Sequence, residues 1–333
     1  DRNSDICEGA TKANQNRHHY GYHYHQSDET ADQCARTKDD FESVWGEAVV
    51  RGFPNYYGIA KGAAKITPEA FRSFCRRHYL AYTEEFPSPD ILNPADMLAC
   101  FKTSEPVYDR DLLRSLARRE LQLRNVDIRV REEILSGKIV QGKKILSILH
   151  EKHTYTESFD CVISAMYGNS NLFCSWFGFP HTDLTVLVKE LILLRIPRLP
   201  AIGLTIMDRF MSFLPAGQSE LFTLGDVIFS CHVKERVANG IPWFPEDIQK
   251  LPTRQAEILG NNIHFAPFLK RAEFLETQFI PFPLSQTVKN PDDRITEVTS
   301  HGHECWSVLG GKMVSAVTVA RQLAEEIRKE YNA

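Results

Sequence analysis

The feature of the sequence that most constrains the fold is its C-terminal unit, where a short apolar run meets two glycines and then a long amphipathic stretch. We expect a strand over Cys305 to Leu309, a turn at Gly310-Gly311 and a helix over Met313 to Tyr331. A helix start exposes free N–H groups and the positive end of the helix dipole, so this turn favours an anion or an electron-rich carbonyl group. A pair of glycines before a helix is also a common turn, so the unit indicates a ligand site only together with other signals.

A second strand is expected at residues 159–165, where the chain reads FDCVISA. Such a nearly continuous apolar run is typical of a strand buried on both faces of a parallel sheet. Ser164, Ala165 and Gly168 lie at or just beyond its carboxyl end, where open α/β sheets bind nucleotides and where small residues let a ligand approach the backbone. Taken alone, the same residues also fit an ordinary strand-to-loop turn.

The hydrophobic pattern of the remaining residues predicts helices together with strands of both parallel and antiparallel type. Thr67 before Pro68, and Asp109 further on, are typical helix caps. Helices are expected at 31–46, 67–79, 109–125 and 184–194, and from 252 toward 279. Strands are expected at 126–130, 138–140, 144–149, 202–207, 210–214 and 227–233. An antiparallel block placed between strands of parallel type indicates an α/β fold, in which a Rossmann-like nucleotide-binding layer is interrupted by an antiparallel-sheet, α+β domain.

Composition excludes several classes of protein. The 333 residues carry 39 basic and 43 acidic side chains, a net charge of −4, which argues against nucleic acid as the main partner. The longest apolar run, 184–194, is too short for a membrane span and is interrupted by Lys189 and Glu190. The eight cysteines are scattered without a CxxC pair, so we expect reduced thiols in a cytoplasmic protein.

The opening stretch, residues 9–25, is rich in histidine and tyrosine. Its four histidines are His18, His19, His23 and His25. A metal site is one interpretation, since His23 and His25 would point the same way from a strand. No Asp, Glu or Cys stands at an obvious ligand spacing inside the stretch, so we expect no metal. A loop that faces a non-metal ligand and a plain structural loop are the other two interpretations.

Together, in this order and at this spacing, these clusters resemble the FAD-dependent oxidoreductases of the D-amino-acid oxidase-like superfamily, which includes glycine and sarcosine oxidases, glycerol-3-phosphate dehydrogenases and 2-hydroxyglutarate oxidases. The resemblance covers nearly the whole chain, and Tyr108 to Leu113 with Val126 to Val130 look like the helix and strand before the adenine side. It implies FAD as the cofactor and a Rossmann-like layer of the glutathione-reductase type. The cofactor-binding residues that it implies are Gly9, Ala10, Thr11, Asn14, Arg17, His18, Gly21, Val130, Ala165, Gly168, Gly302, Gly310, Gly311, Lys312 and Met313.

The sequence departs from this family at one point. The family begins with a βαβ unit whose G-x-G-x-x-G turn holds the FAD pyrophosphate, and that motif does not occur in these residues. The chain starts where this unit would just have ended. We therefore expect either a fragment of a longer protein or a chain in which FAD binding has been lost or rebuilt. The alternative to an enzyme is a non-catalytic relative, a binding or assembly subunit without the cofactor cradle.

The resemblance implies a discontinuous FAD-binding domain of residues 1–45, 108–180 and 298–333 and a substrate domain of residues 46–107 and 181–297. The expected reaction is hydride transfer to flavin N5 from a C–H bond beside an amine or hydroxyl group of a small molecule. His19 is the candidate catalytic base, because an imidazole titrates near neutrality. The candidate substrate-binding residues are Tyr22, Tyr24, Arg209 and His232.

Overall fold

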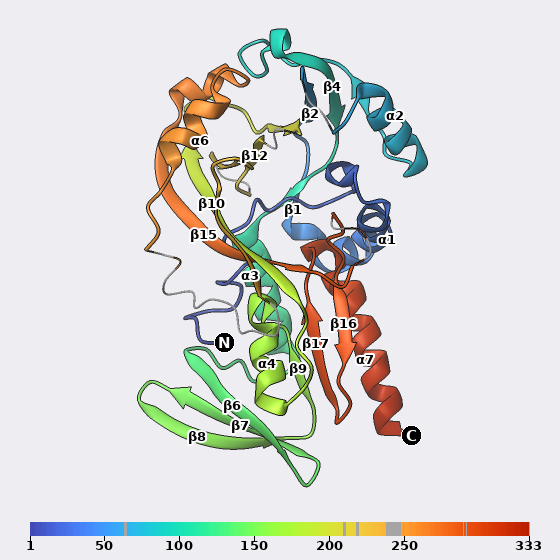
Figure 1. Ribbon diagram of the computed structural model, residues 1–333, viewed down its shortest axis with the longest axis vertical. Coiled ribbons are helices and arrows are strands. Elements are labelled where there is room, and N and C mark those ends of the chain that lie inside the picture. The colour runs from blue at the N-terminus through green and yellow to red at the C-terminus, as the bar shows by residue number, and fades with distance from the viewer. Residues whose placement is uncertain are drawn as a thin grey trace.

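The computed structural model describes residues 1–62, 65–208, 211–217, 220–237, 248, 250–288, 290 and 292–332. Figure 1 shows a large sheet at the top, a smaller sheet beside the C-terminal helix, and a β-meander at the bottom. The long strands β10 (Leu184–Arg195) and β15 (Glu273–Ser285) run side by side from the large sheet toward the smaller one. They therefore link the large sheet to the part of the molecule that holds the C-terminal unit.

Within the described residues, the large sheet has nine strands, in the order β14-β10-β13-β12-β11-β2-β4-β3, with β15 paired to β10. Besides β10 and β15, its strands are β2 (Asn55–Ala60), β3 (Thr83–Glu84), β4 (Met97–Thr103), β11 (Gly203–Met207), β12 (Met211–Pro215), β13 (Leu221–Gly225) and β14 (Cys231–Val237). Neighbouring strands are antiparallel except β2 and β11, which are parallel. The expected antiparallel block is present, with one parallel pair inside it.

The prediction of a helix over residues 184–194 is wrong, because this segment forms β10. The strand is paired along both edges, to β13 and β14 on one side and to β15 on the other. It is also buried on both faces along most of its length. A strand covered on both faces lacks the alternation that marks a strand, so its apolar run resembles that of a buried helix.

The helix predicted from residue 252 toward 279 is wrong beyond its first part. α6 covers only Gln255–Asn262, and a short 3₁₀ helix, η5, follows at Pro267–Arg271. The chain then enters β15, which pairs with β10 along its whole length. Pro267 has no backbone N–H to continue a helical ladder, which agrees with a break before this residue.

Two strands of the large sheet differ from the prediction. Residues 227–230 form a turn, where the Asp226 carboxylate accepts hydrogen bonds from the N–H groups of Ile228 at 2.7 Å and Phe229 at 2.8 Å. β14 therefore begins only at Cys231, and β13 is a strand that the pattern does not predict. Phe210, the first residue of another expected strand, lies outside the described residues, and the rest of that strand is β12.

The C-terminal unit is confirmed as strand, turn and helix. The elements around it are β9 (Val162–Ser164), β16 (Glu297–Ser300), β17 (Cys305–Leu309), the 3₁₀ helix η6 (Met313–Ser315) and α7 (Ala316–Asn332). β17 pairs with β16 in antiparallel and with β9 in parallel fashion. β9 is the second predicted strand in a shorter form, and Ile163 within it is 45% exposed. The expectation that this strand is buried on both faces is therefore wrong.

The β-meander consists of β6 (Glu132–Val140), β7 (Lys143–His150) and β8 (His153–Phe159). The predicted hairpin between β6 and β7 is confirmed. Gln141 and Gly142 at its turn have φ angles of 49° and 79°. A two-residue hairpin turn requires positive φ at such positions, and its twist then matches that of the strands.

The strand predicted over residues 126–130 is not formed. Asn125 has a φ of 52° and turns the chain away from the preceding helix. The Arg129 carbonyl accepts a hydrogen bond from the amino group of Asp1 at 2.7 Å, and the Arg131 N–H donates to the Asn3 carbonyl at 2.8 Å. Contacts with the first residues of the chain thus take the place of a strand ladder.

The remaining elements are η1 (Tyr22–Tyr24), α1 (Asp28–Trp45), η2 (Gly46–Ala48), β1 (Val49–Val50), α2 (Pro68–Arg77), η3 (Pro94–Asp96), β5 (Val107–Tyr108), α3 (Arg110–Leu123), η4 (Tyr167–Asn169) and α4 (Ser170–Phe177). Both predicted caps are confirmed. The Thr67 hydroxyl accepts from the Ala70 N–H at 3.1 Å, and the Asp109 carboxylate accepts from the Leu112 N–H at 2.9 Å. In the described part of the chain, no helix combines the length and the apolar character needed to cross a membrane.

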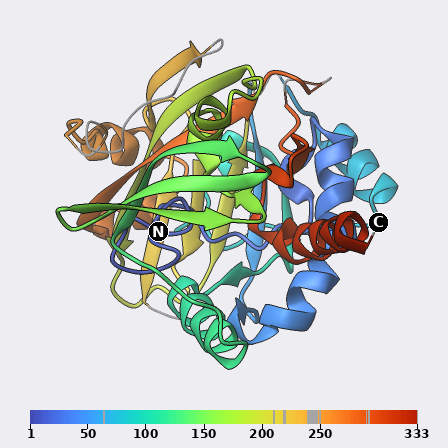
Figure 2. The same cartoon turned by 90° about the horizontal axis from the view of Figure 1, so that it is seen from below.

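α1 packs against η6 and α7, as Figure 2 shows for the blue and red helices. The contact includes hydrogen bonds to Asp40 of α1, from the Thr318 hydroxyl at 2.6 Å and from the Arg321 guanidinium at 2.5 Å. The His- and Tyr-rich opening stretch leads directly into α1. The packing of these two helices therefore brings the opening stretch to the start of the last helix.

Candidate functional site

The opening stretch and the turn before α7 meet around the side chain of Lys312, and the region where Tyr24, Phe282 and Lys312 meet is called the recess below. Lys312 Nζ lies 4.9 Å from the centroid of the Tyr24 ring, which belongs to η1. The same amine lies 5.9 Å from the centroid of the Phe282 ring on β15, so the large sheet also contacts this lysine. The structure therefore brings together Tyr24 and Lys312, two residues for which the sequence predicts a common ligand.

A cavity opens beside Phe282 and the Gly310-Gly311 turn, and its lining includes Tyr167 and Arg294. Gly310 has open space where a side chain would begin, since no heavy atom lies within 4 Å of its Cβ position. A Cβ on Gly311 would instead lie 2.1 Å from the carbonyl oxygen of Arg294. Gly310 thus leaves room for a ligand, whereas Gly311 lets the neighbouring backbone approach.

His19 and Tyr24 are joined at the recess. The Tyr24 hydroxyl lies 3.1 Å from His19 Nε2, and His19 Nδ1 is buried without a hydrogen-bond partner among the described residues. Burial lowers the pKa of His19 well below its usual range, and the positive charges of Lys312 and Arg17 act in the same direction. Burial likewise raises the pKa of Tyr24 well above its usual range. At neutral pH the pair is therefore a neutral imidazole beside a protonated phenol.

Lys312 is a cation in an unfavourable place. The pKa of its amine is lowered to about 7, chiefly by burial; Cys34 acts in the opposite direction, and the charges of Arg294 and Lys189 lower the pKa by smaller amounts. Within the described chain, no carboxylate lies within ion-pair distance of this amine. A negatively charged or electron-rich ligand in the recess would therefore be stabilised by Lys312.

The helix start itself has fewer free donors than the sequence suggests. The N–H of Gly311 donates to the Thr296 hydroxyl at 2.9 Å, and the N–H of Lys312 points to the same oxygen at 3.4 Å. Both N–H groups therefore already have a hydrogen-bond acceptor within the protein. The positive charge that the turn offers to a ligand comes chiefly from the Lys312 side chain.

Lys189, Phe282 and Arg294 lie in the same region, although the sequence does not predict them as site residues. Lys189 Nζ lies 4.9 Å from the centroid of the Phe282 ring, and burial lowers the pKa of the amine. A signal for Lys189 was present, because a lysine inside an otherwise apolar run is costly to bury unless it has a task. Phe282 and Arg294 carry no comparable signal, since each stands in an ordinary context.

Arg17, predicted to bind the cofactor, is instead part of a buried network. Its guanidinium donates to Glu105 at 2.8 Å, to the Tyr57 hydroxyl at 2.5 Å, and to the hydroxyls of Thr205 and Ser212, both at 2.7 Å. Both terminal nitrogens are thus engaged with the protein. The structure gives Arg17 the role of holding the opening stretch against the large sheet.

Asn14 also has partners inside the protein. Its amide nitrogen donates to the carbonyls of Ala10 at 3.0 Å and Thr11 at 2.8 Å, and its oxygen accepts from the Tyr108 hydroxyl at 3.0 Å. Gly9 is exposed at the start of this turn, where its carbonyl accepts from the Lys12 N–H at 2.9 Å. The predicted group of Gly9, Ala10, Thr11 and Asn14 therefore forms a turn that is held by its own hydrogen bonds and by a hydrogen bond from Tyr108.

Two aromatic residues of the opening stretch face the core. His18 Nε2 lies 2.9 Å from a carboxylate oxygen of Glu42, and the Tyr22 hydroxyl donates to the Ala81 carbonyl at 2.5 Å. Both side chains are buried. Neither is placed like Tyr24, so the structure separates Tyr22, predicted to bind substrate, from the recess residues.

His232, the other described residue predicted to bind substrate, is buried on the large sheet. Its Nε2 lies 2.6 Å from a carboxylate oxygen of Glu190, and their side chains are 3% and 0% exposed. Glu190 follows Lys189 in β10, and successive side chains of a strand point to opposite faces. His232 is therefore on the face away from Lys189. Arg209 lies outside the described residues.

The remaining predicted cofactor residues are scattered around this region. Gly302 is exposed in the hairpin between β16 and β17, at the opposite end of β17 from Gly310. The others are Val130 before β6, Ala165 after β9, Gly168 in η4 next to Tyr167, Gly21 before η1 and Met313 in η6. The structure groups Gly168 and Met313 with elements of the recess, and it does not bring Gly302 there.

The four histidines of the opening stretch do not form a common metal centre. Over the described residues, no group of three or more His, Cys, Asp or Glu side chains is arranged to hold a metal ion. His18 contacts Glu42, His19 contacts Tyr24 and His25 contacts Gln26 at 3.2 Å. All eight cysteines are free thiols.

A small mixed sheet, a large sheet and a terminal strand-turn-helix unit follow one another in an order that can be compared with known folds. The chain shares its fold with solved glycine, glycerophosphate and iminodiacetate oxidases, in agreement with the fold that the sequence resemblance predicts. No family model and no curated protein matches the sequence. The fold is therefore established by structural similarity at low sequence identity.

Three solved structures illustrate this similarity. The glycine oxidase from Geobacillus kaustophilus superposes with a TM-score of 0.74 at 9% identity, over 99% of this chain and 87% of the oxidase. The L-α-glycerophosphate oxidase from Mycoplasma pneumoniae, solved with FAD bound, gives a TM-score of 0.73 at 13% identity, over 98% and 87% of the two chains. The iminodiacetate oxidase from Chelativorans sp. BNC1 gives 0.70 at 14% identity, over 95% and 84%.

Proposed function

We propose that this chain is an FAD-dependent oxidoreductase, which oxidises a C–H bond next to an amine or hydroxyl group of a small polar molecule. The observation that carries the proposal is the recess where His19, Tyr24 and Lys312 meet, although they lie near opposite ends of the sequence. The solved structures of the same fold support it, because those described above are oxidases and one of them contains FAD.

The residues present fit the isoalloxazine end of FAD. Gly310 leaves open space beside the backbone, and Tyr24 and Phe282 supply aromatic side chains. Lys312 supplies a positive charge where electron density would increase during reduction. When bound, FAD would accept a hydride, which is redox chemistry that amino-acid side chains do not provide.

We assign to His19 the role of accepting the proton that the substrate loses. Oxidation of such a C–H bond removes a hydride from carbon and a proton from the neighbouring nitrogen or oxygen. The lowered pKa of His19 keeps its ring neutral near pH 7, so a ring nitrogen retains its lone pair, and it also makes the imidazole a weaker base than a free histidine. For Nδ1 to carry the lone pair, Nε2 must hold the hydrogen and donate it to the Tyr24 oxygen. In this arrangement Tyr24 fixes the tautomer of the base.

The recess also supports the proposed division of labour between the two domains. His19, Tyr24, Gly310 and Lys312 belong to the segments assigned to the FAD-binding domain, and Phe282 belongs to the substrate domain. A small amine, amino acid or hydroxy acid would bind between the two sets of residues.

Flavin uptake tests the proposal directly. The purified chain is mixed with FAD, passed over a desalting column and examined by visible absorption. Retained flavin bands, and their bleaching by one member of an anaerobic panel of amines, amino acids and hydroxy acids, are the expected result. A protein that stays colourless after exposure to FAD would contradict the proposal and favour a non-catalytic binding or assembly subunit.

The role of His19 has its own test. His19→Asn should lower the rate of flavin reduction by roughly 100-fold or more, because general-base catalysis usually contributes that much. Tyr24→Phe should have a smaller effect in the same direction, since it removes only the group that fixes the tautomer. His153→Asn, an exposed histidine on β8, is the matched control. An unchanged rate and pH profile in His19→Asn would dismiss the histidine as the base.

A further inference from the structure

Thr296, the residue before β16, holds the backbone at the start of the terminal helix. Its hydroxyl oxygen accepts a hydrogen bond from the Gly311 N–H at 2.9 Å, and the Lys312 N–H points to the same oxygen at 3.4 Å. The Ser315 hydroxyl lies 2.7 Å from the Thr296 hydroxyl. One side chain from outside the turn therefore contacts three residues between the Gly310-Gly311 turn and α7.

The hydroxyl groups of Thr296 and Ser315 form a directed chain around Lys312. The Ser315 hydroxyl donates its single hydrogen to the Lys312 carbonyl at 2.8 Å. It can then only accept from Thr296, whose hydroxyl hydrogen points to Ser315 and whose lone pairs face the N–H groups. Ser315 is fully buried, so solvent does not replace its hydroxyl. The N–H and the carbonyl of Lys312 are thus both tied to this pair of hydroxyl groups.

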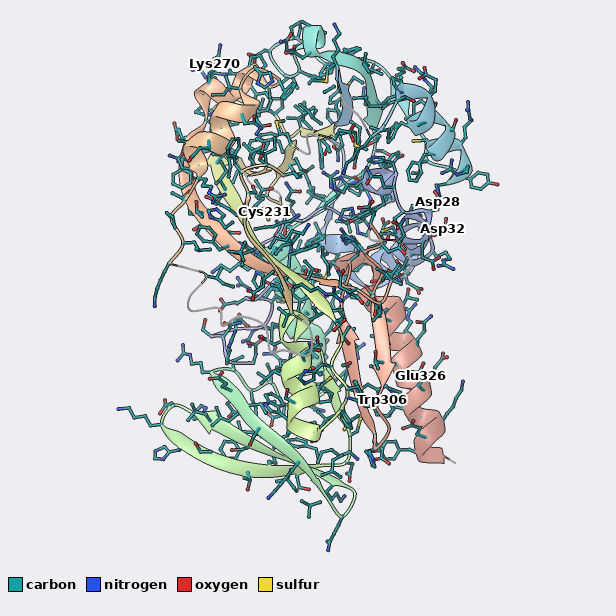
Figure 3. The ribbon with its side chains drawn as sticks, in the orientation of Figure 1. Asp28, Asp32, Cys231, Lys270, Trp306 and Glu326 are labelled. Carbon is teal, nitrogen blue, oxygen red and sulfur yellow. The ribbon has the colours of Figure 1, made fainter. Side chains whose placement is uncertain are left out.

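Helix α1 holds the segment that carries Thr296. The Gln33 side-chain oxygen accepts a hydrogen bond from the Thr296 N–H at 2.9 Å, and the Thr30 hydroxyl accepts one from the Arg294 N–H at 2.8 Å. Residues three apart lie on the same face of a helix, so one face of α1 fixes the backbone on both sides of residue 295. Figure 3 labels Asp32 on this helix. The support of the Thr296 hydroxyl therefore extends from α1 to the start of α7.

The backbone of Lys312 carries a side chain that is costly to keep in place. Burial lowers the pKa of the amine to about 7, so the protonated amine would be more stable in water. A lysine has a flexible four-carbon stem, which can turn the amine to solvent unless its base is fixed. Lys312 has extended backbone angles, φ −144° and ψ 143°, directly before η6. Fixing this conformation keeps the amine beside the ring of Tyr24, at 4.9 Å.

We propose that Thr296 is the positioning residue for Lys312: its hydroxyl, paired with that of Ser315, fixes the backbone from which the amine enters the recess. The role rests on the proposed function only in that the amine would stabilise a reduced flavin there. Thr296 is not a catalytic residue in this scheme, because its hydroxyl is engaged by the protein. The position of the amine can be measured without flavin.

The ionisation of Lys312 in the FAD-free chain tests the inference. The chain is labelled with ¹³C at the lysine Cε atoms and titrated by NMR, and the resonance absent from Lys312→Met identifies the residue. The unchanged chain should show an amine that titrates near pH 7. Thr296→Val removes the hydroxyl and keeps the shape of the side chain. It should raise this midpoint by roughly one pH unit or more, because the amine gains access to water.

The surroundings of the amine come from several elements, and they are unchanged by these variants. The titratable groups whose charges interact with it are His19, His23, Tyr24, Cys34, Lys189 and Arg294. Since none of them is substituted, a raised midpoint in Thr296→Val reports a movement of the amine and not a change in the neighbouring charges.

Matched variants separate a local effect from a general one. Thr296→Ser keeps the hydroxyl and should keep the midpoint of the unchanged chain. Thr299→Val replaces an exposed threonine on β16 and should also leave it unchanged. Ser315→Ala and Gln33→Met loosen the support of Thr296 and should raise the midpoint in the same direction. These two variants carry the test if circular dichroism shows that Thr296→Val does not fold.

A double-variant cycle with FAD adds a readout that a merely structural role would not move. Thr296→Val should lower the preference for reduced over oxidised FAD at least roughly threefold, because the cation is displaced from the ring. In the Lys312→Met background, the same substitution should change this preference by less than about twofold. A residue that only stabilises the fold would have the same effect in both backgrounds.

The outcomes distinguish this inference from the proposed function. A midpoint that stays near pH 7 in Thr296→Val, or that rises equally in Thr299→Val, overturns the inference. A midpoint near 10.5 in the unchanged chain also overturns it, because the amine is then not held in the recess. A chain that takes up no flavin, yet shows the raised midpoint in Thr296→Val, overturns the proposed function and supports the positioning role. Bound flavin with equal effects in both backgrounds overturns the positioning role and leaves the oxidoreductase standing.

Discussion

Arg17 and Glu105 form an ion pair deep inside the molecule, with 2.8 Å between Nη1 and Oε2 and side chains that are 2% and 0% exposed. The other carboxylate oxygen of Glu105 accepts a hydrogen bond from the Tyr20 N–H at 2.8 Å. Glu105 therefore holds the backbone on both sides of His19, through the side chain of Arg17 and through the N–H group of Tyr20. The position of the candidate base depends on a contact that takes no part in the chemistry.

Removing one partner of this pair should be strongly destabilising. Arg17→Met leaves the Glu105 carboxylate buried without its counter-charge, and the free energy of unfolding should fall by about 3–5 kcal/mol in urea titrations. The double variant Arg17→Met/Glu105→Gln should lose less than the sum of the two single variants. Arg72→Met is the control, because its ion pair with Glu84 lies at the surface, with side chains 29% and 42% exposed, and should contribute about 1 kcal/mol or less. Equal losses in Arg17→Met and Arg72→Met would show that the buried pair is not a structural anchor.

The two adjacent glycines of the terminal turn should respond differently to the same substitution. Gly311→Ala would push a Cβ against the Arg294 carbonyl and should lower the melting temperature, because the backbone must move. Gly310→Ala meets open space and should leave the melting temperature of the FAD-free chain nearly unchanged. The same methyl group projects toward the proposed ligand, so it should weaken FAD binding. If Gly310→Ala binds FAD as tightly as the unchanged chain, the open space beside Gly310 is not part of the flavin site.

Local signals account for the parts of the fold that the sequence predicts well. The caps at Thr67 and Asp109, the turn at Gln141 and Gly142, and the terminal strand-turn-helix unit each depend on residues close together in the chain. The wrong prediction of a helix over residues 184–194, which form β10, has a different origin. This strand is buried because β13, β14 and β15 surround it, and no window around residues 184–194 contains that information.

The candidate site was predictable only in part for a similar reason. A polar residue in the histidine- and tyrosine-rich opening stretch can face a ligand or another part of the protein, and the sequence does not distinguish the two. Arg17 and His18 face Glu105 and Glu42, which lie far along the chain, whereas His19 next to them borders the recess. Adjacent residues with the same chemical character thus have different roles.

His232 should prove to be a stability residue. His232→Asn would remove the buried imidazole partner of Glu190 and should lower the free energy of unfolding by about 1–3 kcal/mol, because one buried hydrogen bond to the carboxylate is lost while those from Thr277 and the Arg254 N–H remain. The affinity for FAD and the KM for a substrate should remain within about twofold, since His232 lies on the face away from Lys189. An increase in KM with an unchanged melting temperature would instead place His232 in the substrate pocket, as the sequence analysis expects.

The buried amine of Lys312 should make the stability of the FAD-free chain depend on pH. Its folded pKa of about 7 lies below the ordinary value of 10.5, so between these limits the unfolded chain binds more protons than the folded chain. The free energy of unfolding should therefore rise with pH across this window, relative to a variant without the amine. Below pH 7 both states are protonated, and the full cost of burying the cation is present.

Lys312→Met removes this cost, so the variant should be more stable than the unchanged chain by roughly 1–3 kcal/mol at pH 6. The advantage should shrink as the pH approaches 10, because the amine is then neutral in the folded chain and the unfolded chain begins to lose its proton. Urea unfolding at pH 6, 8 and 10 measures the difference, with Lys329→Met as the exposed control on the same terminal helix. A difference that stays constant with pH would mean that Lys312 reaches solvent or a counter-charge, and the recess would then lack the cation that the proposed flavin site requires.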